Sequence, residues 1–229
     1  CLTFNGKTDP IASIFYILSR MEEYTSIYRD KFGRFEGVNS VLYRFGWLEK
    51  VICDRWAMDI INWLKEKQIL KPHLKKQHVS LLPTFDIDNA YAYKHKGIWR
   101  TILSNSKDFL LGRQKRLIER QKVQTGSYRD PYDTFDVIRE IGVKYADMKL
   151  FWLIGERSEK DRNISIENLE HQQLIIALDR DFEVNLHPSY NSNGNTQIIE
   201  KEKISLQHVL DREIIRSRQH YLRFDLPRT

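Results

Sequence analysis

The stretch Val79-Ser-Leu-Leu-Pro-Thr-Phe-Asp-Ile-Asp88 decides the fold class that we expect for this chain. An apolar run of strand length ends here in two carboxylates, Asp86 and Asp88. In α/β proteins the carboxyl end of a strand is where ligand-binding and catalytic groups are usually presented. Side chains alternate along a strand, so residues two apart point to the same side. We therefore expect both carboxylates in one pocket, where they would bind a divalent cation or hold a proton.

Strand and helix patterns alternate after this stretch. Further strands are predicted at residues 150–154, 183–186 and 215–221, and helical patterns lie at about 98–122, 131–146, 166–179 and 197–211. Strands that alternate with helices indicate a parallel sheet or an α/β barrel. Four strands are too few to close the usual barrel of eight. We therefore expect an open, incomplete barrel in which the four strands are parallel neighbours.

Residues 1–75 are predicted to form a helical N-terminal region, and residues 76–229 a second, α/β domain. Asp9-Pro10 suits the start of a helix over residues 8–27, because Asp caps a helix and Pro fits its first turn. A second helical pattern covers residues 47–69. Its apolar stripe includes Trp56 and Trp63, which we expect to be buried in a core.

Composition limits the classes of protein to which this chain can belong. Its 229 residues are 41% hydrophobic, enough for a packed core. The net charge of +6 is spread among 31 acids, which does not favour a nucleic-acid partner. Two cysteines, Cys1 and Cys53, provide neither a disulfide framework nor zinc-ligand spacing. No run approaches 18 apolar residues, so no membrane span is expected.

The first residues lack the basic start and apolar centre of a signal peptide, so we expect a cytoplasmic location. The chain begins with Cys1 and stops soon after its last predicted strand, which suggests a piece of a longer protein. The sequence does not indicate an oligomeric state.

Polar side chains follow three of the predicted strands. In a parallel sheet these strand ends lie on one face although they are far apart in sequence. Histidine with carboxylate is a usual set of ligands for first-row metals, and a bound metal acidifies water into a nucleophile. A further carboxylate would deprotonate that water. The candidate residues are Asp86 and Asp88, His187 and Asn191, and Arg218 and His220.

Several segments resemble a known family. Thr84-Phe-Asp-Ile-Asp88 is similar to the first motif, Thr-Phe-Asp-Asp, of the NodB-homology polysaccharide deacetylases of carbohydrate esterase family 4. Leu186-His-Pro-Ser-Tyr-Asn191 resembles their second motif, and Ser217-Arg-Gln-His-Tyr221 lies where their third, arginine-bearing motif is expected. The chain resembles more closely a bacterial subgroup with a helical N-terminal region, to which Ile14-Phe-Tyr-Ile-Leu-Ser-Arg-Met-Glu-Glu-Tyr24 is similar.

The resemblance implies a parallel-stranded NodB-like (β/α) barrel over residues 76–229, incomplete at its C-terminus and preceded by the helical region. It also implies a metal-dependent hydrolase that removes acetyl groups from an acetylated sugar or polysaccharide. The expected partners are therefore a carbohydrate substrate and a divalent metal, with zinc first. The family's last motif, which carries a general-acid histidine, would lie beyond residue 229, so the fragment is expected to be inactive by itself.

The same resemblance implies roles for single residues. Asp86 would be the general base, and Arg218 would pair with it and keep it ionised. Asp88 and His187 would hold the metal, and Asn191 stands at the position of the family's second metal histidine. An amide oxygen is a harder and weaker ligand than imidazole. His220 would then be an additional ligand that compensates for the amide.

Two other functions stay open at this point. The asparagine at a ligand position is also what a catalytically degenerate deacetylase fold would show, one that binds a glycan or a protein partner. In addition, Asp86-Ile87-Asp88 is an Asp-x-Asp sequence, which holds the metal of a nucleotide sugar in many glycosyltransferases. That function needs a nucleotide-binding sheet before the motif, where the pattern in this chain is helical.

Overall fold

The computed structural model describes residues 1–69, 80–145, 147–224 and 226 of the chain. It divides into two compact units: unit 1 is Cys1–Val79 with Arg223–Thr229, and unit 2 is Ser80–Leu222. All the candidate site residues of the sequence lie in unit 2. Each unit is described by itself.

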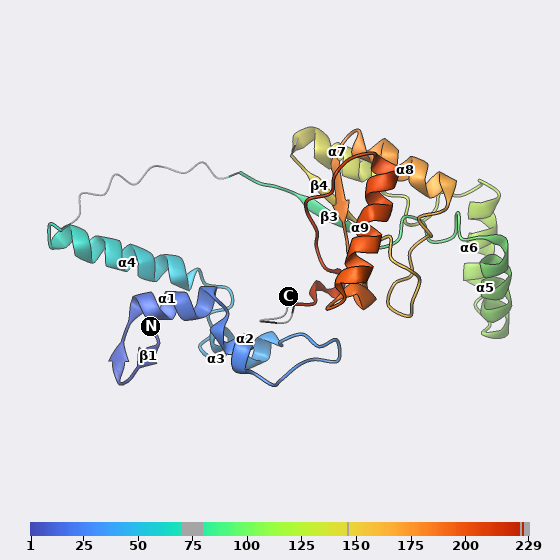
Figure 1. The fold of residues 1–229 in the computed structure, drawn as a ribbon. Helices are drawn as coiled ribbons and strands as arrows, with labels where there is room; N and C mark the ends of the chain where they lie inside the picture. Colours follow the sequence, from blue (N-terminus) through green and yellow to red (C-terminus); the bar gives the residue numbers. More distant parts are fainter. Residues whose placement is uncertain (70–79, 146, 225, 227–229) are drawn as a thin grey trace. The chain divides into compact units, whose positions relative to one another are not determined.

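Unit 1 contains a small hairpin followed by helices (Figure 1). The strands β1 (Thr3–Phe4) and β2 (Lys7–Thr8) pair antiparallel across Asn5-Gly6, both with positive φ, as a tight hairpin turn requires. The helices are α1 (Pro10–Leu18), α2 (Met21–Thr25), η1 (Gly37–Asn39), α3 (Val41–Arg44) and α4 (Ile52–Glu66).

The capping prediction at the start of α1 is confirmed, because the Asp9 side chain accepts a hydrogen bond from the Ala12 backbone N–H at 2.9 Å. The aromatic stripe of α4 is only partly buried. Trp56 is buried and packs edge-on against Trp47, with ring centroids 5.2 Å apart. Trp63 is 52% exposed, so the prediction that it belongs to a core is wrong. Seven residues are about two helical turns, so Trp63 lies on the same face of α4 as Trp56. It is close to the C-terminal end of the helix, beyond the part that packs against Trp47.

Unit 2 is built on a three-stranded parallel sheet in the order β3 (Thr84–Ile87), β4 (Lys149–Trp152), β5 (Glu183–Leu186) (Figure 1). The register places Asp86 opposite Phe151, and Phe151 opposite Asn185. The central strand is buried along most of its length, as expected of a parallel strand covered on both faces. Because all three strands run the same way, their carboxyl ends share one edge of the sheet.

Five helices complete unit 2: α5 (Ile98–Leu110), α6 (Gln114–Gln124), α7 (Phe135–Lys144), α8 (Leu169–Asp179) and α9 (Thr196–Leu210). Helices α8 and α9 contact each other and β5, and α5 packs against α6 (Figure 1). Asn168 and Asn195 cap α8 and α9 by accepting from the backbone N–H groups three residues later. The core is formed by side chains of the sheet and of α7, α8 and α9, such as Leu150, Trp152, Ile175, Leu178, Val184 and Leu206.

The expected incomplete NodB-like barrel is wrong. The described residues form an open three-stranded parallel sheet and a separate two-stranded antiparallel sheet, with no closed barrel. The predicted fourth strand at 215–221 contributes a single parallel bridge, between Leu186 and Ser217. Ile215 is 68% exposed, so little apolar burial favours an extended pairing there. The chain then leaves the extended conformation, since Tyr221 has a φ of 62°.

Two element boundaries also differ from the sequence expectation. The first strand is shorter than predicted: it begins at Thr84, because Pro83 has no N–H to donate to a sheet, and Val79 lies outside the described residues. The helix expected from residue 131 begins at Phe135. Asp130 does not cap it. Instead its carboxylate accepts hydrogen bonds from the backbone N–H groups of the loop at 92–94 and of Tyr132.

Candidate metal centre

Three side chains meet at the carboxyl edge of the sheet in unit 2. Asp88 follows β3 directly, and His187 follows β5 directly. His220 begins the short helix η3 (His220–Leu222), after the segment that bridges to Leu186. The backbone of this segment is anchored to the end of β5, because the His220 N–H donates to the Pro188 carbonyl at 3.0 Å. The parallel sheet and this anchor therefore bring together residues that lie up to 132 positions apart, counting from 88 to 220.

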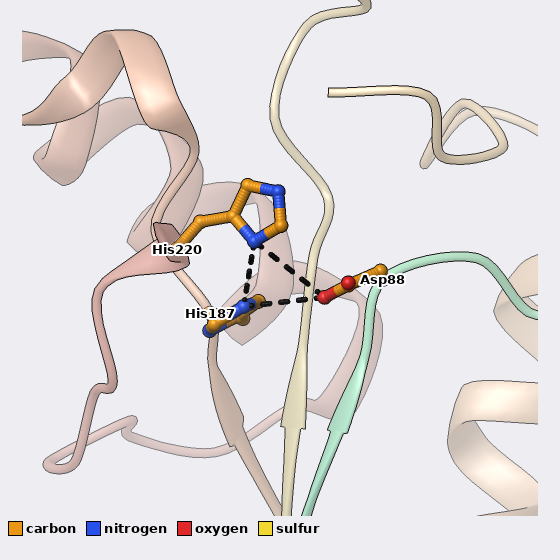
Figure 2. Close-up of side chains that lie close together, drawn as sticks. All are labelled: Asp88, His187 and His220. Atoms are coloured by element: carbon orange, nitrogen blue, oxygen red, sulfur yellow. Dashed lines mark hydrogen bonds and ion pairs between the residues drawn. The ribbon is translucent and has the colours of Figure 1, made fainter. Parts of the chain in front are cut away.

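The ligand-type atoms of these residues point toward one another (Figure 2). His187 Nε2 lies 3.3 Å from Asp88 Oδ1 and 2.9 Å from His220 Nδ1. His220 Nδ1 lies 3.5 Å from Asp88 Oδ1. Both imidazoles are buried, whereas the Asp88 side chain is 59% exposed. The cluster therefore has two buried walls and one face open to solvent.

Each histidine has a second ring nitrogen, which points away from this cluster: Nδ1 in His187 and Nε2 in His220. His187 Nδ1 hydrogen-bonds to the backbone carbonyl of Arg218, and because a carbonyl only accepts, Nδ1 carries the proton. His220 makes a backbone hydrogen bond to Lys160, and its Nε2 lies 3.9 Å from Asp161 Oδ1. His187 Nε2 and His220 Nδ1 are then the ring nitrogens that face each other, within hydrogen-bond distance, and the Asp88 carboxylate. Backbone and carboxylate partners of this kind are typical behind metal-bound histidines.

The electrostatics favour the protonation states that a metal requires. The hydrogen bond from His187 lowers the pKa of Asp88, and the nearby His220 adds to this effect against the opposing effect of burial. Burial lowers the pKa of His220, more than the Asp88 charge raises it. Metal ligands must be an ionised carboxylate and neutral imidazoles. At neutral pH these shifts hold Asp88 charged and His220 uncharged.

The spacing of the three donor atoms fits one divalent cation. Zinc binds histidine nitrogen and carboxylate oxygen at about 2.0–2.2 Å, so neighbouring ligand atoms of a tetrahedral site lie about 3.3–3.6 Å apart. The two separations from Asp88 Oδ1, 3.3 and 3.5 Å, fall in this range, and the two imidazole nitrogens are closer, at 2.9 Å. Without a cation, a hydrogen bond joins these two nitrogens, and a cation bound by all three atoms would replace its proton. Two nitrogens and one oxygen suit zinc or a similar first-row metal and leave a fourth position open, as catalytic sites do.

Asp86 lies beside this cluster but has a different partner. Its Oδ1 accepts a hydrogen bond from Arg218 Nη1 at 2.8 Å, and Arg218 Nη2 donates to Thr84 Oγ1 at 2.7 Å. The guanidinium also covers the Phe151 ring, 4.4 Å from its centroid. Arg218 thus binds His187 through its carbonyl and Asp86 through its side chain. It fixes both residues with respect to each other.

Asn191 occupies a different position from the one that its spacing suggests. It is exposed, lies in the short helix η2 (Tyr190–Ser192), and lines a cavity with Ser189 and Glu202. In the described part of the chain its side chain makes no hydrogen bond to Asp88, His187 or His220. The third donor of the cluster is instead His220, which the sequence indicated only as an additional ligand.

Asp161 is the residue that sequence reasoning missed as part of this site. It is fully buried, accepts hydrogen bonds from the Tyr190 N–H and the Ser158 hydroxyl at 2.8 Å each, and faces His220. A local pattern carries no sign that its carboxylate would be buried behind a histidine 59 residues later.

Comparisons with known proteins cover only unit 1. A family model described as "Family of unknown function (DUF7033)" matches residues 3–69. This segment ends before the first site residue, Asp86. No curated protein and no solved structure matches the chain. Among the described residues, no helix has the length and apolar character needed to cross a membrane.

Proposed function

We propose that unit 2 belongs to a divalent-metal-dependent hydrolase that removes acetyl groups from an acetylated sugar or polysaccharide. The observation that carries the hydrolase proposal is the convergence of one carboxylate oxygen and two imidazole nitrogens within 3.5 Å of one another at the edge of a parallel sheet. The acetylated carbohydrate comes from the resemblance of residues 84–88, 186–191 and 217–221 to the polysaccharide deacetylases. Zinc is the cation that the donor set fits first.

A cation held by Asp88, His187 and His220 would supply an acidified water and polarise the acetyl carbonyl. Asp86 would accept a proton from this water as the oxygen adds to the carbonyl carbon. The bond from that carbon to the sugar nitrogen or oxygen would then break, and the same proton would pass to the departing atom. The products are acetic acid, which releases its remaining proton to solvent as acetate at neutral pH, and a free amine or hydroxyl, so atoms and charge balance without a further reactant.

Arg218 is the positioning residue for this base. Its bonds to Asp86 and Thr84, and its stacking on Phe151, hold the guanidinium in one orientation. The Asp86 side chain is still 33% exposed, so a water molecule can reach it.

The two alternatives find less support in the geometry. The degenerate-fold hypothesis depended on an asparagine in place of a metal histidine, but His220 supplies a third donor in this structure. The glycosyltransferase hypothesis uses an Asp-x-Asp sequence at one nucleotide-bound metal. In this chain Asp86 pairs with Arg218, and Asp88 faces the histidines. The two acids thus have different surroundings, which suits a base and a ligand.

The test separates the metal from the base. Zinc affinity is measured by calorimetry on the metal-stripped chain, and acetate release from acetylated chitin oligomers and acetylated xylan by an enzymatic acetate assay. Asp86→Asn should keep zinc affinity within about twofold and lose at least 100-fold in acetate release, because general base catalysis contributes about 10²–10⁴-fold. Asp181→Asn is the matched control, since Asp181 forms an exposed ion pair with Arg139.

Absence of stoichiometric zinc binding by the wild-type chain would overturn the metal centre. Full turnover by Asp86→Asn would overturn the role of Asp86 and leave the centre standing. If residues 1–229 alone release no acetate, the same pair of variants is compared in the longest natural form of the protein, and no acetate release by that form would overturn the deacetylase proposal.

A further inference from the structure

A cavity of about 870 Å³ lies in unit 2 beside the edge that carries the metal centre. Its wall includes Gly155, which follows β4, and Ser189, which follows β5. The loop that contains Asp161, behind His220, also contributes lining residues on either side of that aspartate. The cavity therefore shares with the candidate metal centre the segments that follow β4 and β5 and the loop around Asp161. None of its residues is used in the chemistry proposed above.

One part of the lining is cationic. Lys96, Arg100 and Arg157 all line the cavity, and in the described part of the chain none of them forms an ion pair. Burial, together with the positive charges of Arg100 and Arg157, lowers the pKa of Lys96 to about 8. Burial and the charge of Arg157 likewise lower the pKa of Arg100. The three cations are thus close enough to repel one another, and an anion between them would relieve this repulsion.

The acids of the lining do not cancel this charge. Glu156 pairs with Lys201 at 2.5 Å, so these two neutralise each other. Glu167 is exposed to solvent. Glu202 is buried, burial raises its pKa, and its Oε2 already accepts a hydrogen bond from the Ser189 N–H. The excess of positive charge therefore belongs to the part formed by Lys96, Arg100 and Arg157.

Another part of the lining presents buried acceptors. Glu202 Oε1 and Asn163 Oδ1 have no hydrogen-bond partner among the described residues, and both side chains are at least 95% buried. The remaining atoms of these groups are used: Glu202 Oε2 accepts from the Ser189 N–H, and Asn163 Nδ2 donates to the Gly155 carbonyl. A buried acceptor without a donor costs about 1–3 kcal/mol. Both oxygens have almost no accessible surface, so hydroxyl or amide N–H groups of a ligand would supply the missing donors once these side chains turn toward the cavity.

We propose that this cavity binds an acidic sugar unit, one that carries a carboxylate or a phosphate, as part of the substrate of the hydrolase. The anionic group pairs with Arg100 and Arg157, because a guanidinium binds carboxylate and phosphate through two parallel hydrogen bonds. Sugar hydroxyls donate to Asn163 Oδ1 and Glu202 Oε1 as these two side chains turn toward the cavity. The assignment of this sugar to a substrate rests on the proposed hydrolytic function. The binding of the sugar itself rests only on the cavity.

The test is calorimetric titration of the whole chain with glucuronic acid, glucose 6-phosphate, neutral glucose and inorganic phosphate. At least one acidic sugar should bind, and neutral glucose at least tenfold more weakly. Arg100→Gln and Arg157→Gln should each weaken that binding at least fivefold. Arg180→Gln removes the same charge at an exposed residue just after α8, outside this cavity, and should leave binding unchanged.

Binding by only one of the two acidic sugars would support the proposal and identify the anionic group. Several results would overturn it: no binding by either acidic sugar at millimolar concentration, equal weakening by Arg180→Gln, or glucose binding as tight as that of the acidic sugars. Equally tight binding of inorganic phosphate alone would show a simple anion site and overturn the role of Asn163 and Glu202.

A zinc titration keeps this proposal separate from the metal centre. Arg100→Gln should retain wild-type zinc affinity, and His187→Gln should lose zinc affinity but bind the acidic sugar as wild type does. Zinc binding without arginine-dependent sugar binding would overturn the cavity proposal alone. Arginine-dependent sugar binding without zinc binding would overturn the hydrolase and, with it, the description of the sugar as a substrate.

Discussion

Two buried histidine environments lie within unit 2, and they differ in what faces the ring nitrogens. His171, in α8, accepts a hydrogen bond from Trp152 Nε1–H at 2.8 Å through Nε2, and its Nδ1 lies 3.1 Å from the Ser165 carbonyl. One nitrogen accepts and the other donates, so this neutral ring is satisfied. His187 and His220 instead each direct one ring nitrogen at the other ring and at Asp88.

Burial does not distinguish the two environments. The residues are 1% (His171), 2% (His187) and 8% (His220) exposed. What differs is the partner: an indole N–H donor completes His171, whereas the facing nitrogens of the two histidines at the sheet edge have only each other and the Asp88 carboxylate. A buried histidine is thus structural when the protein supplies both partners, and a candidate ligand when a cation would have to supply one.

The largest expected effect is on metal affinity. His187→Gln should weaken zinc binding at least 100-fold, because it removes one of three ligands, whereas His171→Gln should change it less than twofold. Calorimetric zinc titration of both metal-stripped variants measures the difference, and circular dichroism checks that both are folded. Similar zinc affinities in the two variants would remove the distinction between these histidines.

The second prediction concerns the stability of the His171 environment. Trp152→Phe keeps an aromatic ring next to Phe135 but removes the N–H that His171 accepts. A buried acceptor is then left without a donor, so the free energy of unfolding should fall by about 1–3 kcal/mol. Urea unfolding of the metal-free chain measures this loss. Zinc affinity should stay within twofold of wild type, and a large loss of it would show that Trp152 also supports the metal centre.

A smaller effect is expected at Asp161. Asp161→Asn keeps the size of the side chain and an oxygen for the Tyr190 N–H, but removes the negative charge 3.9 Å from His220. Partners behind a metal ligand contribute about 10–100-fold in affinity. At this long distance we expect about a tenfold loss of zinc affinity, measured by competition with a chromophoric chelator. Asp181→Asn, which removes an exposed carboxylate, should show no change.

The smallest effect is a pH dependence of stability at His171. Burial lowers the pKa of His171 below its ordinary value of about 6.5. As the pH falls below about 6.5, the imidazole therefore binds a proton in the unfolded chain but not in the folded chain. The free energy of unfolding thus decreases toward acid pH. His171→Gln should reduce this decrease, by up to about 1.4 kcal/mol per pH unit within the window. Urea unfolding at pH 5–8 tests it, and identical slopes would contradict the shift.

The fold was predictable where local patterns decide it. The apolar runs that became β4 and β5 were visible because both strands are buried on both faces, and parallel pairing followed from the helices between strands. The barrel expectation failed at residues 215–221. Their apolar start resembles a strand, but Arg216 and Arg218 bind Glu183 and Asp86 through their side chains, and the chain makes only one bridge with Leu186.

The candidate site was predictable in its residue types and only partly in its arrangement. Asp88, His187 and His220 were all candidates, because each follows a predicted strand or lies near its end. Spacing along the chain placed Asn191 next to His187, whereas the structure places His220 Nδ1 there, at 2.9 Å. The segment after β5 turns into a short helix, and the backbone of His220 is held by Pro188. Neither this turn nor this backbone hydrogen bond produces a periodic pattern in the sequence from which it could be predicted.

The sequence alone thus determined the parallel strands, the cap of the first helix and the residue types at the strand ends, because these depend on side chains a few positions apart. The tertiary structure alone decided that the side-chain donor atoms of Asp88, His187 and His220 lie close together. The tautomer of His187 depends on the Arg218 carbonyl 31 residues later, and Asp161 is aligned with His220 across 59 residues. Such contacts form only when the sheet and its connections are packed, since distance in space, not spacing along the chain, sets the energy of a charge or a hydrogen bond.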